Sequence, residues 1–354
     1  MFVYFIFIIF VLFLSFIAYK VDNPKHKKFI IACVFLLLFS FSAFRYNVGA
    51  DYRFYVRDFY LIKGGYTSRF EILFLFINKF IIFMFDNPDW VFIISSFITF
   101  FLIFKSINNE SSKFFISIII LFASRFYLYS FTQVRQYIAI AIFLYSLKYI
   151  INGNWKKYFF LIAIAFGFHK SALIYFFIYF FRYLHFEKKQ YIIICILAPF
   201  LNPIVKYLYL LFGSTLFGNY ISEEMIYGHT PVVFIATGII FTLIPILVFN
   251  KIKTNEKNNL YLNIQLLSWI IIVAASSFFE SYRIIAMFIY ISILLIPECY
   301  EKMNKKIRFV FLVIFLMMAI YTSYLMIIYP DSSFIPYQTI FNKWKWWRFK
   351  WKKN

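Results

Sequence analysis

Acidic residues, cysteines and familiar catalytic motifs are all scarce in this chain. It holds 15 Asp and Glu against 36 Lys and Arg, and 3 Cys. No Walker A, G-x-G-x-x-G, H-E-x-x-H, CxxC or G-x-S-x-G motif occurs, so nucleotide-driven pumping and serine hydrolysis have no support. Cys33, Cys195 and Cys299 lack metal-ligand spacing and lie in or beside apolar runs, which indicates unpaired, buried thiols. The sequence therefore predicts no metal site and no cofactor.

Apolar residues, in contrast, dominate the composition. The chain is 63% hydrophobic and 25% aromatic, with 54 Phe and a mean hydropathy of +0.78. No water-soluble fold has enough interior for that much apolar surface, so most of it must face lipid. The sequence predicts an all-α polytopic integral membrane protein: one helical bundle over residues 1–342, then a basic, Trp-rich tail over 343–354. Phe2–Tyr19 lacks a basic leader and a cleavage site, so we expect it to remain as the first span.

The basic residues set the orientation that we expect. A net charge of +21 would suggest nucleic acid for a soluble protein, but most Lys and Arg here occupy short loops between apolar runs. Such a bias marks cytoplasmic loops. Six loops hold 19 of the 36 basic residues, and they cover residues 20–28, 105–113, 148–157, 182–189, 251–257 and 302–308. All six are cytoplasmic only if 70–85 does not cross and 157–184 crosses twice, with a break at His169. This arrangement predicts about twelve crossings and both termini outside.

With this orientation, the other polar residues gather on the extracytoplasmic side. The region 45–86 becomes an extracytoplasmic loop with juxtamembrane helices. A helix after Gly49 would place Asp51, Tyr55 and Asp58 on one face, and Arg53, Arg57 and Tyr60 on the opposite face. The aspartates would then point inward and the arginines towards lipid phosphates, or the two kinds would simply pair. Asp51 is the sharper candidate for a ligand contact, because Gly49 allows close approach of the backbone.

Three further sites contain polar residues at membrane edges. Ser130-Phe131-Thr132-Gln133 has capping-box spacing and predicts a helix over 134–150. Arg135 and Gln136 would occupy its first turn, where a cation is unfavourable without an anionic partner; the alternative is an arginine that reaches the interface. His169 is costly at membrane depth unless it has a partner, so it is either a satisfied structural histidine or a functional one. Glu280 and Arg283 are spaced for an ion pair, structural or functional.

Taken together, these motifs resemble the EpsG family of polytopic membrane proteins, relatives of the Wzy-type polymerases that lengthen bacterial surface polysaccharides. The resemblance covers nearly the whole chain. The residues that carry it are Arg45-Tyr46-Asn47-Val48-Gly49-Ala50-Asp51-Tyr52 with Tyr55, then Glu71, Val134-Arg135-Gln136-Tyr137-Ile138-Ala139, Ile162-Ala163, Phe168-His169-Lys170-Ser171-Ala172-Leu173-Ile174, Arg283 and Pro336-Tyr337. The VRQ and HKSALI segments are fairly specific together, and neither would be so alone.

The resemblance implies a membrane glycosyltransferase of GT-C-like architecture in the bacterial plasma membrane. Its substrate would be an oligosaccharide repeat on undecaprenyl pyrophosphate, polymerised at the extracytoplasmic face into O-antigen, capsule or exopolysaccharide. The implied partners are that lipid-linked sugar, membrane lipids, a chain-length regulator and a flippase, with no nucleic acid.

On that basis, roles can be assigned to the candidate residues. Arg135, Arg283 and Arg45 would stabilise the pyrophosphate leaving group. His169 or Asp51 would act as the base for the acceptor hydroxyl, although Asp51 would equally suit a metal or the sugar. Gln136, Tyr52, Tyr55 and Glu280 would contact substrate. The rival hypothesis is a flippase or exporter of the same lipid-linked sugar, without chemistry. Polar residues strung through the membrane would favour that rival, and here they gather on one face.

Overall fold

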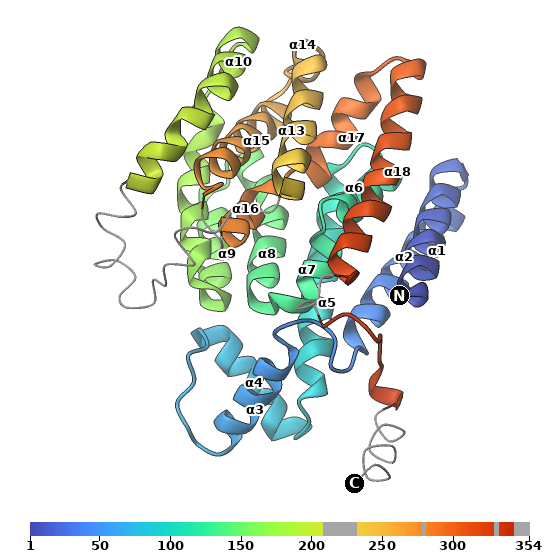
Figure 1. The fold of residues 1–354 in the computed structure, drawn as a ribbon, viewed down its shortest axis with the longest axis vertical. Helices are drawn as coiled ribbons and strands as arrows, with labels where there is room; N and C mark the ends of the chain where they lie inside the picture. Colours follow the sequence, from blue (N-terminus) through green and yellow to red (C-terminus); the bar gives the residue numbers. More distant parts are fainter. Residues whose placement is uncertain (208–231, 278–280, 329–332, 343–354) are drawn as a thin grey trace. The chain divides into compact units, whose positions relative to one another are not determined.

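The computed structural model describes residues 1–207, 232–277, 281–328 and 333–342 (Figure 1). These residues form helices and connecting segments, and they contain no β-strand; one isolated antiparallel bridge joins Arg45 to Thr339. The all-helical prediction is therefore confirmed. The chain divides into two compact units. The first comprises Met1–Glu110, Leu121–Phe176 and Ile314–Asn354, and the second comprises Ser111–Ile120 and Phe177–Val313.

The described helices vary widely in length. Their bounds are α1 Phe2–Lys20, α2 Pro24–Ala43, α3 Tyr52–Lys63, α4 Ile72–Met84, α5 Asp89–Glu110, α6 Phe114–Ala123, α7 Phe126–Thr132, α8 Val134–Ile151, α9 Trp155–Phe168, α10 Lys188–Leu197, α13 Val232–Leu247, α14 Phe249–Ile252, α15 Glu256–Ala274, α16 Ser281–Ile289, α17 Ser292–Lys302 and α18 Lys305–Ile328. Three 3₁₀ helices, η1 Lys170–Tyr183, η2 Ala198–Phe200 and η5 Ile340–Asn342, accompany them.

Six helices among the described residues are long and apolar enough to cross a membrane, or up to eight if two bent pairs each count as one span. The bent pairs are α6 with α7, at 52°, and α16 with α17, at 48°. Several of the twelve expected crossings do not meet this criterion. The helices α9 and η1 have 14 residues each, and α13 has 16. The helix α15 has 19 residues but contains buried amides at Asn258, Asn259, Asn263 and Gln265.

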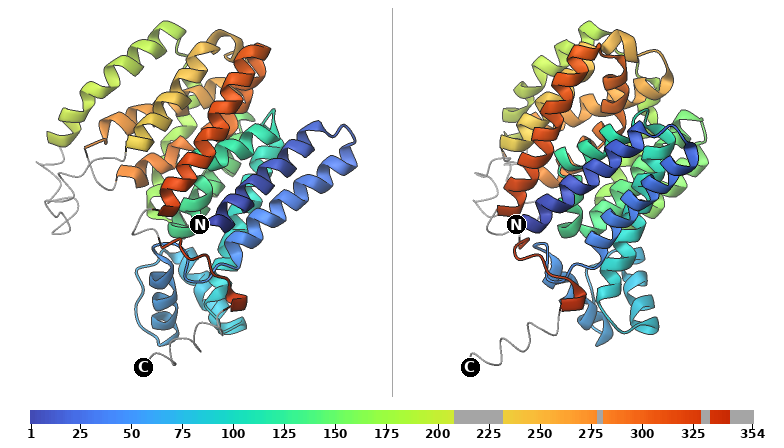
Figure 2. Two further views of the ribbon diagram at one scale, coloured as in Figure 1. Left: turned by 45° about the vertical axis from the view of Figure 1, so that its right-hand side comes forward. Right: turned by 90° about the vertical axis from the view of Figure 1, so that its right-hand side faces the viewer.

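In the first unit, α8 packs against α5 and α9, and α5 also packs against α2, which pairs with α1. The short helices α3 and α4 pack on each other, and α4 also contacts α5 and α9. Figure 2 shows α3 and α4 together beside one end of α5, away from the longer helices of this unit. As expected, α4 is too short to qualify as a span. Its Phe74, Asn78 and Ile81 are buried, while Phe76 and Phe83 are exposed.

The C-terminal part of the first unit crosses the loop after α2. The amide of Tyr46 donates to the Gln338 carbonyl at 2.8 Å, and the amide of Gly49 donates to the Ser333 carbonyl at 3.2 Å. The hydroxyl of Tyr4 donates to the Phe334 carbonyl at 2.7 Å. This segment, residues 333–342, therefore ties the 44–51 loop to α1.

In the second unit, α15 is central and contacts α10, α13, α16 and α17. Its buried amides bond to backbone carbonyls at the end of η1. The Asn263 amide donates to the carbonyls of Phe181 and Leu184 at 2.9 and 2.8 Å, and Asn259 donates to Leu184 at 2.7 Å. These bonds satisfy carbonyl groups that the end of a helix leaves unpaired.

Candidate functional site

A carboxylate, a guanidinium and an imidazole meet at the start of α4. Glu71 is the residue before α4, Arg135 stands in the first turn of α8, and His169 follows α9. Arg135 Nη1 pairs with Glu71 Oε2. Nδ1 of His169 lies 3.4 Å from Glu71 Oε1, and the amide of Lys170 donates to the same oxygen at 3.2 Å. We call these three side chains the Glu71 cluster.

Local structure explains how three distant segments supply this cluster. The α9 helix ends at Phe168, and His169 is extended at φ −156° and ψ 120°, so the chain breaks where the sequence predicts a break. Gly167 lets α4 approach α9 closely, because an added Cβ would lie 2.7 Å from Leu73 Cδ1. The Glu71 carboxylate is thereby held beside the break at His169.

The cluster is largely shielded from water. The side chains of Glu71, Arg135 and His169 are 9%, 18% and 25% exposed. Burial by itself would raise the pKa of Glu71, but the contact with His169 and the charge of Arg135 outweigh it and lower that pKa to about 2. Glu71 is therefore a carboxylate at any physiological pH.

Arg135 has aromatic neighbours as well as its ion pair. Its guanidinium carbon lies 4.9 Å from the centroid of the Phe70 ring, and its side chain interacts with the Tyr55 hydroxyl. Arg135 Nε makes no hydrogen bond within the part of the chain that the structure describes. From the sequence, an arginine at this helix N-terminus is expected to need an anionic partner. In the structure, Glu71 is that partner.

The arrangement also suits proton transfer. A neutral imidazole carries its proton on one nitrogen, and a carboxylate beside Nδ1 favours the tautomer with the proton there. Nε2 is then the acceptor nitrogen, as a general base requires. Glu71 can therefore orient His169 and Arg135 at once.

Helix α3 follows the faces expected from its sequence. Tyr52, Tyr55 and Asp58 are buried, while Arg53, Arg57 and Tyr60 are exposed. Asp58 pairs with Arg57 at 3.2 Å, which is the simple pairing considered above. Tyr52 stacks on Phe92 at 4.2 Å between ring centroids, and its hydroxyl donates to Asp89 at 3.4 Å.

Other candidate residues lie elsewhere in the fold. Asp51 is half-buried and directly precedes α3, close enough to Tyr55 to influence its hydroxyl. Gln136 is buried in the first turn of α8. Arg283 is exposed on α16, in the second unit, and contacts the Tyr282 hydroxyl at 3.5 Å. Glu280, and with it the expected Glu280–Arg283 pair, lies outside the described residues, as does the tail 343–354.

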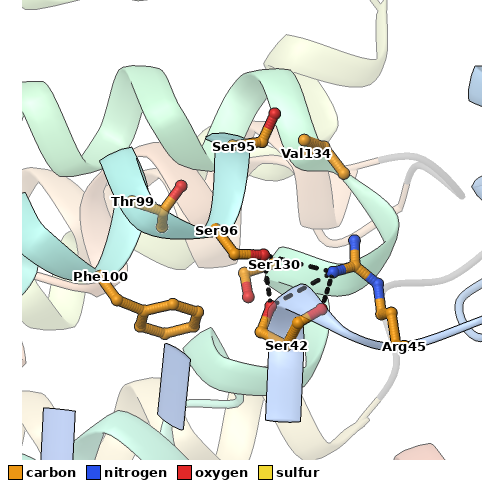
Figure 3. Close-up of a pocket in the computed structure, with 8 residues that line it drawn as sticks. All are labelled: Ser42, Arg45, Ser95, Ser96, Thr99, Phe100, Ser130 and Val134. Atoms are coloured by element: carbon orange, nitrogen blue, oxygen red, sulfur yellow. Dashed lines mark hydrogen bonds between the residues drawn. The ribbon is translucent and has the colours of Figure 1, made fainter. Parts of the chain in front are cut away.

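Arg45 is buried at 1% exposure in a small polar pocket (Figure 3). Its guanidinium bonds to Ser42 and Ser96 and to the Phe131 carbonyl. The pocket is lined by Ser42, Arg45, Ser95, Ser96, Thr99, Phe100, Ser130 and Val134. Both terminal nitrogens of Arg45 are thus bonded within the protein, while its buried Nε makes no hydrogen bond in the described part of the chain.

The expected capping box before α8 is wrong. Ser130 lies inside α7, where its hydroxyl donates to the Tyr127 carbonyl at 2.6 Å. Gln133 caps α8 without a side-chain hydrogen bond. The reason is that residues 126–132 form a helix of their own, so Ser130 satisfies its hydroxyl locally. The start of α8 at Val134 is nevertheless as expected.

Glu71 is the residue whose role the sequence reasoning missed. It belongs to the segments that carry the family resemblance, yet it received no role. The available signal was a lone carboxylate opening an otherwise apolar helix, since residues 72–85 contain no Asp or Glu. A group that is so costly near lipid calls for a cationic partner.

Comparison with known proteins identifies one family. The model of the EpsG family matches residues 28–339, which include all three members of the Glu71 cluster. No curated protein and no solved structure matches the chain. Among the described residues, no three His, Cys, Asp or Glu side chains gather to hold a metal ion.

Proposed function

Since the chain belongs to the EpsG family, which is linked to exopolysaccharide biosynthesis, we propose that it is a repeat-unit polymerase. It joins oligosaccharide repeats carried on undecaprenyl pyrophosphate, at the extracytoplasmic face of the bacterial plasma membrane. The multiple apolar helices support a multi-pass membrane protein. The product is a surface polysaccharide of the O-antigen, capsule or exopolysaccharide kind.

The Glu71 cluster carries this proposal. Polymerisation needs a cation for the departing pyrophosphate and a base for the attacking hydroxyl. Arg135 and His169 supply one of each, and Glu71 contacts both side chains. The flippase hypothesis gives no reason for a carboxylate to orient an imidazole.

In the reaction that we propose, a hydroxyl of one repeat attacks the anomeric carbon of another repeat. The bond between that carbon and the pyrophosphate oxygen breaks, and undecaprenyl pyrophosphate leaves with the bonding electrons. His169 Nε2 accepts the proton of the attacking hydroxyl. Arg135, whose side chain is 18% exposed, stabilises the negative charge of the leaving group.

The remaining candidates have secondary roles in this proposal. Gln136, Tyr52 and Tyr55 shape the sugar-binding side of the site. Asp51 binds sugar or serves as the alternative base. A chain-length regulator and a flippase are the protein partners.

We also propose the finer topology. The 14-residue helices α9 and η1 would enter and leave the membrane as a pair that meets at His169, and α13 and α15 would complete a total of about twelve crossings. The cluster would then lie at the outer face, within a GT-C-like arrangement. The six basic loops support this orientation through the positive-inside bias.

Deletion of the gene, followed by electrophoresis of the surface polysaccharide, tests the proposal. A polymerase mutant should display single repeats, whereas loss of all surface sugar would indicate a flippase. A normal ladder would refute both functions. Complementation with Glu71→Gln, compared at matched protein abundance, should give single repeats, and the control Asp86→Asn, which removes an exposed ion pair with Lys63, should restore the ladder.

A further inference from the structure

Arg45 joins three helical segments of the first unit. It lies two residues after α2, and its Nη1 donates to the Ser42 carbonyl, to Ser42 Oγ at 3.2 Å and to Ser96 Oγ of α5 at 3.4 Å. Its Nη2 donates to the Phe131 carbonyl of α7 at 3.2 Å. Figure 3 shows the guanidinium aimed at Ser42 and Ser96, with Ser130 beside them.

The charge of Arg45 is stabilised without an acidic partner, since no carboxylate pairs with it in the described part of the chain. Two rings take that place: the guanidinium carbon lies 4.9 Å from the Phe92 centroid and 4.8 Å from the Phe131 centroid. Burial lowers the pKa of Arg45 to about 10, so the group is still a cation at neutral pH. A cation with 1% exposure is unsuited to meet a lipid-linked donor directly.

Arg45 is linked to the Glu71 cluster indirectly, through its hydrogen bond to the Phe131 carbonyl. Phe131 is in the last turn of α7, Gln133 breaks the helix at φ −93° and ψ 56°, and Arg135 follows in the first turn of α8. Gly49 covers the same carbonyl from the 44–51 loop. At φ +99°, with an added Cβ only 2.8 Å from the Phe131 oxygen, this position requires glycine.

We infer that Arg45 is a positioning residue that, together with Gly49, fixes the α7–α8 break and thereby the place of Arg135. The inference deepens the proposed function and rests on it, and it replaces the expectation that Arg45 itself binds pyrophosphate. A lysine at position 45 would keep the charge but lose the planar fork that serves Ser42 and Phe131 at once.

Two measurements on the purified full-length protein in lipid nanodiscs test the inference. The first is amide hydrogen exchange over residues 126–138, which needs no activity. The second is the kinetics of polymerisation with lipid-linked repeats. The variants are Arg45→Lys and Gly49→Ala, with Arg53→Lys as the matched control, because Arg53 is exposed and donates to Asn47 Oδ1 at 2.9 Å.

If Arg45 and Gly49 fix the α7–α8 break, amide hydrogen exchange over residues 126–138 should be faster in Arg45→Lys and Gly49→Ala but not in Arg53→Lys. The kcat should also fall about tenfold to a hundredfold in both variants, with the KM for the donor unchanged. If Arg45→Lys does not accumulate, Ser96→Ala removes a single partner of Arg45 and should change both readouts in the same direction by less.

Two results would overturn the inference. One is unchanged exchange over 126–138 in all variants. The other is a raised donor KM with unchanged kcat in Arg45→Lys alone, which would mark direct contact with the donor. If the wild-type protein makes no polymer, the proposed function fails, and the exchange experiment still decides whether Arg45 and Gly49 hold the α7–α8 break.

Discussion

Replacing Glu71 with glutamine should destabilise the folded protein by about 3 kcal/mol at neutral pH, because its carboxylate is held by His169, by Arg135 and by backbone amides. The estimate follows from the pKa of Glu71, which is lowered from 4.5 to about 2; at about 1.4 kcal/mol for each tenfold change, this favours the carboxylate by about 3 kcal/mol. Because the side chains of Glu71 and Arg135 are only 9% and 18% exposed, solvent screening reduces this value little.

A double-mutant cycle measures the coupling between Glu71 and Arg135. The variants are Glu71→Gln, Arg135→Gln and the double variant, each unfolded in mixed micelles with a rising fraction of SDS. The free-energy losses of the two single variants, added together, should exceed the loss in the double variant by about 1–2 kcal/mol, because Arg135 is one of several groups that hold the Glu71 carboxylate. Lys63 and Asp86 form the matched control, since they pair at 2.6 Å but are 44% and 55% exposed. Their coupling should be below about 1 kcal/mol.

The same cycle has a defined pH dependence. The pKa of Glu71 is lower in the folded than in the unfolded state, so its contribution is complete above pH 4.5 and declines as the pH falls towards 2. Between pH 6 and pH 3 the destabilisation caused by Glu71→Gln should shrink by about 2 kcal/mol, and its coupling to Arg135 should shrink with it. Additive losses at Glu71 and Arg135, or a coupling no larger than that of Lys63 and Asp86, would refute the reasoning.

Three further predictions test the site, the topology and the packing. Arg135→Ala should lower polymerisation by roughly 10²–10³-fold for equal amounts of protein, while Arg135→Lys should retain part of it; a full-length ladder from Arg135→Ala would exclude the proposed role. In a background without native cysteines, a membrane-impermeant thiol reagent should label Ala50→Cys but not Asn152→Cys in intact cells, both positions being exposed; the reverse pattern would invert the topology. Asn263→Leu should destabilise the protein by about 1–2 kcal/mol, because the carbonyls of Phe181 and Leu184 each lose one of two donors, and unchanged thermal unfolding would contradict this.

Features set by local sequence could be predicted well. The two faces of α3 follow from side-chain spacing alone. The start of α8 at Val134 was predicted correctly, although the capping box that indicated it does not form. The break at His169 was expected because a 28-residue apolar stretch with a polar centre fits one crossing poorly. In each case, the information lies within one continuous stretch of the chain.

Features set by tertiary contacts could not be predicted. Glu71, Arg135 and His169 are 64 and 34 residues apart in sequence, and no pattern states that they meet. The burial of Arg45 was equally hidden, since its partners Ser42, Ser96 and Phe131 come from three different helices. Six to eight spans among the described residues meet the length criterion, and the total of twelve stays a prediction, because apolar composition alone does not reveal where a helix stops.

The 3₁₀ form of η1 changes what 14 residues can span. At about 2.0 Å per residue they extend about 28 Å, whereas an α-helix of that length extends about 21 Å. Ala172, Tyr175 and Ile178 are buried at a spacing of three, so the contact row runs straight along the helix rather than around it. Each residue that converted from 3₁₀ to α geometry would draw the ends together by about 0.5 Å. The end-to-end length of η1, the helix beside His169, therefore depends on how many of its residues are in 3₁₀ rather than α geometry.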